Sequence, residues 1–361
     1  MTDTSVKYYA STMSGAPALS GEVGKLIAVL DACLVNGFGS VTLSSLVVAS
    51  NVATGTVSGG HNFAMVGNTG PVITIAGATP SGLNGEWRVT VTSSTEFTFV
   101  TTGISDQTAT GTITAKRSPA GFSVAFSSTN DKSWRSDNVA GSRPYFRVLD
   151  STGYEKIAII ALYESMTAWD TGTNGYGMYL EKSATQNSTA REWHLFADDK
   201  AFHLIVTNGG IRSGMFFGDI ITYKAADAYH GCLVANNTND GSNNHLYYTL
   251  NTANGHVVTR SYTQAGLCQL VRFLSCGNAS YMGSVGVTHP NAVDSILTVW
   301  PVVIFEELSP YVIRGMWPGA YSPLIQYSTI SDATVVSGDK DLMVMVFSSG
   351  AVAYDITGPW R

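Results

Sequence analysis

Short runs in which apolar and polar residues alternate recur along most of this 361-residue chain. Alternation with a period of two puts successive side chains on opposite faces of an extended strand, so the pattern restricts the chain to a mainly β fold. Gly, Pro, Asn and Asp separate the runs and supply the turns between them. We therefore expect antiparallel β-sandwich domains, with one N-terminal α-helix as the exception.

That exception is the apolar stretch from Ser20 to Asn36. Its apolar residues follow the spacing of a helical stripe, Ser20 is the expected N-cap, and Asn36-Gly37 is the expected end. The opposite side is also poor in charge, so the helix needs cover on more than one side. The sequence leaves open whether that cover is the main domain or a neighbouring subunit. For the second case the candidate interface residues are Leu26, Ile27, Val29, Leu30 and Leu34.

The positions of the helical pattern and of the alternating runs divide the chain into three segments. Residues 1–40 carry the helix, residues 41–116 predict an inserted Ig-like β-sandwich, and residues 117–361 predict a larger β-rich domain. In the insert, Trp87 begins an alternating run, and Phe97 and Phe99 repeat the alternation. No cysteine pair crosses the insert, so we expect these aromatic residues to form its core.

The larger domain is expected to be strands and hairpins to its end. Two hairpins are predicted, one turning at Asp198-Asp199 and one joining Asp341–Phe347 to Ala351–Asp355. The further predicted strands are Tyr145–Val148, Ile157–Leu162, His203–Val206, His245–Leu250 and Leu297–Trp300.

Charge is scarce. Only 13% of the residues are charged, whereas an ordinary soluble domain has about a quarter. Such a surface does little to oppose association and suits a protein packed against neighbours. The net charge of −6, without any basic cluster, argues against nucleic-acid binding.

The four cysteines show no CxxC spacing, which predicts reduced thiols and folding in a reducing cytosol. The N-terminus lacks the pattern of a signal peptide, and no apolar stretch is long enough for a membrane span.

No catalytic, cofactor-binding or metal site is expected, because no recognised catalytic or nucleotide-binding motif is present. His194 and His203 could face one another in a hairpin, although rim positions on a strand pair are the more ordinary interpretation. The tryptophans leave sugar stacking open, with core packing favoured. Six acidic residues at strand ends leave glycoside hydrolysis open but fix no pair at a working separation: Asp150, Glu164, Asp170, Asp198, Asp199 and Asp219.

Several segments, taken in their order along the chain, resemble those of a known protein family. The N-terminal signature comprises Val6–Tyr9, Gly15–Leu19 and the helix through Cys33–Gly39. The later segments are Ser128–Asp131 with Trp134-Arg135, Arg143–Asp150, Tyr163–Met166 with Asp170–Gly172, Phe217–Asp219, Ile313–Gly319 and Asp355–Trp360. Together they resemble a family of tailed-bacteriophage virion proteins over most of the chain.

The resemblance implies a non-enzymatic structural protein of the tail, baseplate or neck, assembled in the host cytoplasm. Its implied partners are copies of itself and other virion proteins. The stretch from Gly82 to Lys116 is similar to Ig-like inserts of phage structural proteins, which are proposed to touch other subunits or surface glycans. A receptor-binding tail protein that recognises host glycans is the alternative.

Overall fold

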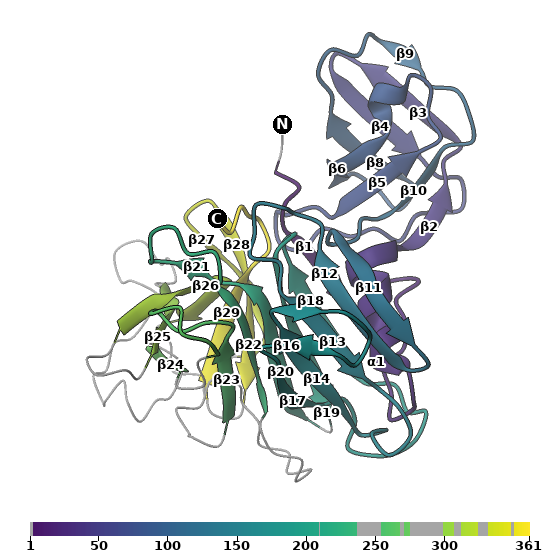
Figure 1. The fold of residues 1–361 in the computed structure, drawn as a ribbon. Coiled ribbons are helices and arrows are strands. Elements are labelled where there is room, and N and C mark those ends of the chain that lie inside the picture. Colours follow the sequence, from purple (N-terminus) through teal and green to yellow (C-terminus); the bar gives the residue numbers. More distant parts are fainter. Residues whose placement is uncertain are drawn as a thin grey trace.

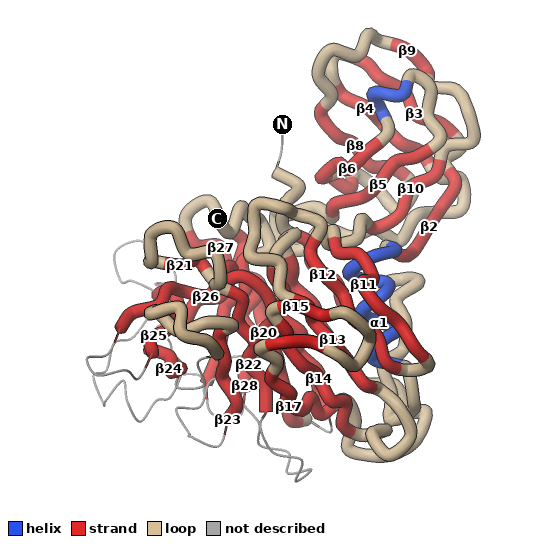
Figure 2. The backbone as a smooth tube through the Cα atoms, in the orientation of Figure 1, coloured by secondary structure: helices blue, strands red, loops and turns tan. Residues whose placement is uncertain are grey.

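The computed structural model describes residues 3–208, 210–236, 254–267, 271–274, 299–306, 312–323, 331–347 and 350–361. The chain forms a broad body from which a smaller module projects (Figure 1). Strands make up nearly all of the regular structure, and the helical turns are few (Figure 2). The expected mainly β, antiparallel fold with one helix near the N-terminus is confirmed.

The module is a sandwich of two antiparallel sheets. The first sheet has the order β2 (Phe38–Thr42), β10 (Thr114–Arg117), β5 (Val72–Ala76) and β6 (Gly85–Arg88). The second has the order β7 (Thr90–Val91), β8 (Glu96–Val100), β4 (Val52–Thr56), β3 (Ser45–Ala49) and β9 (Gln107–Thr108). A short 3-10 turn, η2 (Ser81–Leu83), precedes β6.

Aromatic residues fill the module's core, as the alternation predicts. Phe97 and Phe99 are buried, and the ring of Trp87 stacks on Phe99 with 4.7 Å between centroids. Because β3 and β4 form a hairpin within one sheet, the strand order differs from the immunoglobulin constant domain, where the second and third strands lie in opposite sheets. The module therefore has sandwich architecture with a strand order of its own.

The larger sheet of the body is a long antiparallel array, with β23 (Asn254–Val258) pairing beside β22. Its order is β1 (Lys7–Ala10), β18 (Glu192–Ala197), β19 (Ala201–Asn208), β20 (Ile211–Asp219), β22 (Gly231–Asn236), β17 (Tyr176–Glu181), β14 (Ile157–Tyr163), β13 (Tyr145–Leu149), β12 (Asp131–Ser136) and β11 (Phe122–Ser128). A separate small ribbon pairs β15 (Ser165–Met166) with β16 (Gly172–Thr173).

This sheet curls until its two halves face one another. The ring of Phe146 on β13 lies 5.3 Å from Phe202 on β19 and 4.8 Å from Phe217 on β20, measured between centroids. These strands are not neighbours in the sheet order, so the contacts cross its concave interior. The helical segment, α1 (Lys25–Leu30) followed by the π-turn η1 (Asp31–Asn36), packs in that interior beside β11.

The helix begins later than the sequence predicts, and Ser20 does not cap it. Ser20 Oγ donates to Glu22, whereas the carboxylate of Asp150 accepts the Leu26 backbone N–H at 2.8 Å. Gly24, in the left-handed conformation, makes the turn into the helix, so Ser20 stands outside it. The buried Lys182 ammonium pairs with the same Asp150 carboxylate. The cap therefore comes from a residue far along the chain.

The apolar side of the helix is covered by its own chain. The five residues expected at a subunit interface belong to the core that fills the curled sheet: Leu26, Ile27, Val29, Leu30 and Leu34. Four of these residues have no exposed surface, and Ile27 is 9% exposed. The candidate interface is corrected accordingly, because side chains enclosed by the chain's own strands present no surface to a neighbouring subunit.

A second sheet packs on the convex face of the first. Its order is β24 (Val271–Leu274), β25 (Val299–Glu306), β26 (Val312–Pro323), β29 (Gly350–Asp355), β28 (Lys340–Phe347) and β27 (Ala333–Ser337), with β21 (Ile221–Thr222) pairing beside β26. Phe196 of the first sheet stacks on Tyr354 of the second, with 4.4 Å between ring centroids.

The strand pairs β18–β19 and β28–β29 confirm both predicted hairpins. Strands β13, β14 and β19 confirm three of the five further predicted strands. The predicted strand at His245–Leu250, and the first two residues of the one at Leu297–Trp300, lie outside the described residues.

Candidate interdomain binding cleft

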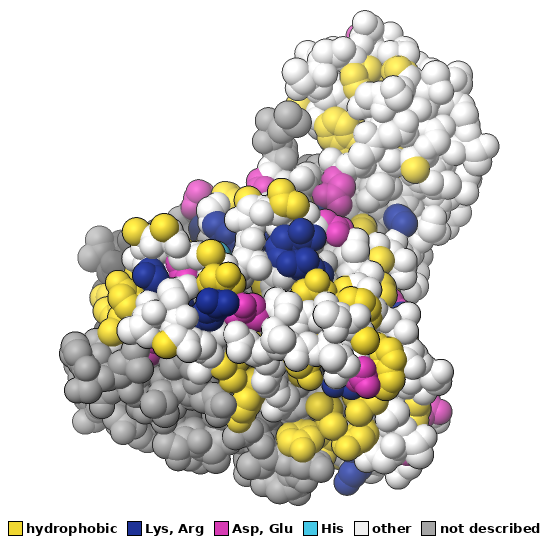
Figure 3. Space-filling view, viewed as in Figure 1, with side chains coloured by type: hydrophobic (Ala, Val, Ile, Leu, Met, Phe, Trp, Pro, Cys, Tyr) yellow, Lys and Arg dark blue, Asp and Glu magenta, His cyan; other side chains and the backbone are white. Residues whose placement is uncertain are grey.

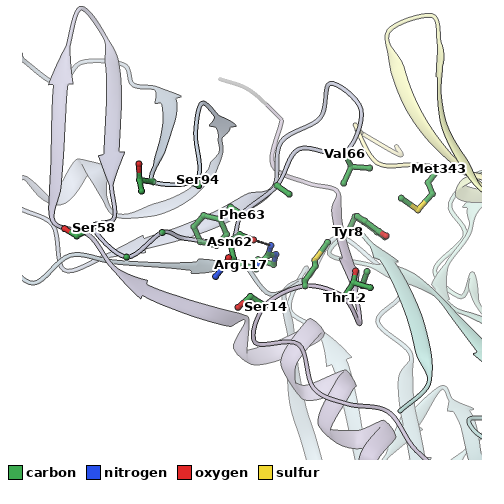
Figure 4. Close-up of a pocket in the computed structure, with 16 residues that line it drawn as sticks. Tyr8, Thr12, Ser14, Ser58, Asn62, Phe63, Val66, Ser94, Arg117 and Met343 are labelled. Atoms are coloured by element: carbon green, nitrogen blue, oxygen red, sulfur yellow. Dashed lines mark hydrogen bonds between the residues drawn. The ribbon is translucent and has the colours of Figure 1, made fainter. Parts of the chain in front are cut away.

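An open cleft of about 840 Å³ lies where the module meets the body (Figure 4). The module contributes the loops around Ser58, Asn62 and Ser94, and the body contributes Tyr8 of β1 and Met343 of β28. These residues come from distant parts of the sequence, so only the folded arrangement of module and body creates the cleft.

The two ends of the cleft differ in polarity. At the module end, Ser58, Asn62 and Ser94 present exposed hydroxyl and amide groups. At the body end, Val66 and Met343 form part of an apolar wall (Figure 4). The cleft thus offers hydrogen-bonding groups at one end and adaptable apolar surface at the other.

Arg117, at the end of β10, forms part of the wall between those ends. The residue is only 3% exposed, and its guanidinium lies over the rings of Phe38 and Phe63 at 5.7 and 5.2 Å. Its Nη2 donates to the carbonyl of Asn62 at 3.0 Å, while Nε and Nη1 have no hydrogen-bond partner among the described residues. Burial lowers the pKa of Arg117 to about 10. A guanidinium enclosed with so few acceptors among the described residues is unusual, because desolvation of a cation is costly.

The module is held against the body by partly buried polar contacts. Arg88 of β6 donates to the carbonyls of Asp3 at 2.6 Å and Val6 at 2.9 Å, both on the N-terminal segment of the body. The Asp341 carboxylate accepts from the Asn68 N–H at 2.8 Å and from the Thr69 hydroxyl at 2.6 Å. These contacts fix the orientation of the two cleft walls.

The two histidines considered as a metal pair share a face of the sheet but have different partners. His194 interacts with Tyr8 at 2.8 Å and Glu192 at 2.9 Å, whereas His203 is buried and hydrogen-bonds the Pro318 carbonyl at 2.9 Å. Burial lowers the pKa of His203 to about 3. Among the described residues, no group of three His, Cys, Asp or Glu side chains has the arrangement of a metal site.

The six acidic residues considered for glycoside hydrolysis are engaged separately. Asp150 pairs with Lys182, and Asp198 pairs with Arg361 at 2.9 Å. The others have their own partners: Glu164 with Arg260, Asp170 with Thr171, Asp199 with Asn138, and Asp219 with Ser142 and His230. Each carboxylate therefore has a local structural role, and no pair is aimed into the cleft.

Most described tryptophans serve the core. Trp134, Trp193 and Trp317 are almost fully buried, whereas Trp169 and Trp300 are 39% and 54% exposed. Cys33 and Cys232 are buried, and Cys268 and Cys276 lie outside the described residues. No described helix combines the length and apolar character that crossing a membrane requires.

Arg117 was not among the residues that the sequence singles out. A signal for it exists in strand β10, where Ala115 and Arg117 are two residues apart and share the buried face. A charged residue at a core-facing position is the informative exception in such a pattern.

A scan against protein-family models finds no match, and a search of the curated proteins finds no matching sequence.

Proposed function

We propose that the chain is a non-enzymatic structural component of a bacteriophage particle, forming a symmetric part of the tail, baseplate or neck through contacts between subunits. The proposal combines the resemblance of the ordered sequence segments with one structural observation. That observation is a firmly seated, projecting module whose outward surface carries almost no charge.

The charge distribution in the module carries the argument. Its residues 38–117 contain six charged side chains: Glu86, Arg88, Glu96, Asp106, Lys116 and Arg117. Arg88 and Glu86 face the body, where Glu86 pairs with Lys7 at 3.0 Å. Arg117 is buried and Lys116 bonds the carbonyl of Asn36 at 2.6 Å, so both lie at the base of the module. Only Glu96 and Asp106 are left for the outward surface, and the visible face is nearly free of charge (Figure 3).

The outer face of the β3–β4–β8 sheet is the part best suited to contact another subunit. Val52 of β4 and Val100 of β8 are direct cross-strand partners and are 38% and 59% exposed. Val47 on β3 is a further exposed apolar residue at 37%. Such a surface loses little solvation on association, so many weak contacts of one kind can sum around a symmetry axis.

Immunogold electron microscopy of purified phage particles tests the assignment to the particle. Antibodies against the chain are expected to label the tail, baseplate or neck at symmetric positions. Absence of the chain from purified particles, measured by mass spectrometry at the level of known virion proteins, would contradict the proposal.

A further inference from the structure

The Arg117 cation in the cleft wall has no ion-pair partner among the described residues. The residues that line the cleft include no Asp or Glu. The flanking Phe38 and Phe63 rings offset part of the desolvation cost, since each cation–π contact contributes about 0.5–2 kcal/mol. Two guanidinium nitrogens remain without acceptors among the described residues. A carboxylate is the group that matches a guanidinium in charge and in hydrogen-bond geometry.

The surface beside Arg117 favours a ligand that carries an apolar group as well as a carboxylate. Tyr8, Met13, Val66 and Met343 form an apolar shelf along the body side of the cleft. Methionine side chains adapt to differently shaped apolar groups, which is why they recur at peptide-binding surfaces. A cleft of about 840 Å³ lies within the usual range for small-ligand sites, about 300–1,000 Å³, and can hold a few residues of a peptide.

The aromatic rings in the cleft are not arranged for sugar stacking. One ring neighbour of Tyr8 is Phe196, stacked at 5.0 Å between centroids, and the other is His194 at 6.0 Å. Phe63 is only 4% exposed and lies under the Arg117 guanidinium. Saccharides in protein sites usually need an open aromatic face, so these contacts favour a peptide over a saccharide.

We propose that this cleft binds a peptide segment of another protein, with an Asp or Glu carboxylate paired to Arg117 and a neighbouring apolar side chain on the shelf. The peptide would come from a neighbouring virion protein, and in that one respect the inference rests on the proposed assembly function. Nη1 lies beside the Gly39 backbone and near the exposed Ser14: a Cβ placed on Gly39 would lie 3.2 Å from Nη1 and 2.7 Å from the Ser14 carbonyl oxygen. In the proposed complex this segment moves aside so that the carboxylate reaches the guanidinium.

Isothermal titration calorimetry with short capped peptides tests this site on the full chain. The probe is a pentapeptide, Ac-Gly-Leu-Asp-Leu-Gly-NH2, and the matched peptide carries Asn in place of Asp. We expect the Asp peptide to bind at least about tenfold more tightly, since each factor of ten corresponds to about 1.4 kcal/mol. Sodium glucuronate is the saccharide probe and is expected to bind more weakly than the Asp peptide.

Three variants test whether the preference for the Asp peptide depends on Arg117. Arg117→Met keeps an apolar side chain between the two rings and is expected to abolish the preference for Asp over Asn. Lys116→Met, which removes a neighbouring cation outside the cleft lining, is the control and should retain the preference. Ser14→Glu places a carboxylate on an exposed position beside Arg117 and should block the Asp peptide even if Arg117→Met fails to fold.

Equal affinity for the Asp and Asn peptides, or no binding of either below 1 mM, would overturn the site. Tighter binding of glucuronate than of the Asp peptide would overturn the peptide assignment. Sedimentation of the chain without peptide reports self-association separately. If the chain self-associates but does not bind the Asp peptide preferentially, the cleft proposal fails and the assembly proposal stands. If the chain binds the Asp peptide preferentially but does not self-associate, the assembly proposal fails and the cleft proposal stands.

Discussion

Single buried or half-buried polar residues set much of the detail of this fold. Arg88 links module to body through backbone carbonyls, Asp150 caps a helix distant in sequence, and His203 sits in the core between the two sheets of the body. Each is satisfied at least in part by a hydrogen bond, as burial requires. We expect replacement of any of them to act first on stability, because each makes structural hydrogen bonds.

His203 gives a pH-dependent prediction at this scale. Burial lowers its pKa in the folded chain to about 3, whereas the unfolded chain titrates near the ordinary value of 6.5. Below pH 6.5 the unfolded chain takes up a proton that the folded chain cannot accept, so acid favours unfolding. The free energy of unfolding should fall by about 1.4 kcal/mol per pH unit from this residue as pH drops from 6.5 towards 3.

The comparison is between the wild-type chain and His203→Gln, whose side chain can still donate to the Pro318 carbonyl. Urea unfolding gives the free energy of unfolding at pH 7 and at pH 4.5. The decrease from pH 7 to pH 4.5 should be smaller in the variant than in the wild-type chain by about 2–3 kcal/mol. Titrating carboxylates affect both chains alike, so they cancel in the difference. Equal losses in the two chains would show that His203 is protonated in the folded state.

At the scale of elements, the helix shows what alternation and spacing can predict and where they fail. The spacing of Leu26, Leu30 and Leu34 correctly predicts a helix, because a stripe of that period must face apolar surroundings. The sequence could not choose Ser20 or Asp150 as the cap, since the contact of Asp150 with Leu26 depends on the curl of the body's larger sheet. Nor could it show that Val29, beside the stripe, is buried in the same core.

Two adjacent helix positions test this burial directly. Ala28 is exposed and Val29 is fully buried. Ala28→Glu should retain the fold with less than about 0.5 kcal/mol of destabilisation, as is usual for surface changes. Val29→Glu puts an unpaired carboxyl into the core and should prevent soluble folding. Circular dichroism and solubility of the two variants are the measurements, and a folded Val29→Glu chain that no longer associates would return this helix to a subunit interface.

The strands were easier to predict than the cleft. Period-two alternation is local, so β13, β14 and the β18–β19 hairpin follow from neighbouring residues. The cleft joins Tyr8, Asn62, Arg117 and Met343, which come together only through the docking of module and body. Local patterns carry no record of that docking, so the site could not be located from the sequence.

At the scale of the whole molecule, the body and the module have separate cores. The body buries two apolar layers, one within the curled sheet and one between the two sheets. The module has its own core and is held at a fixed angle by Arg88 and Asp341. A rigid, weakly charged projection of this kind is suited to repeated contact with identical neighbours, which is the central claim of the proposed function.

Sedimentation velocity of the purified chain tests that claim most directly, with charges introduced on the module's outer face. The wild-type chain is expected to form concentration-dependent oligomers. The double variant Val52→Lys, Val100→Lys should sediment as a monomer, because two adjacent ammonium groups would have to be desolvated in the contact. Val139→Lys, at an 81% exposed position of the body, is the matched control and should associate like wild type. A wild-type chain that remains monomeric at high concentration, or a double variant that associates unchanged, would contradict the claim.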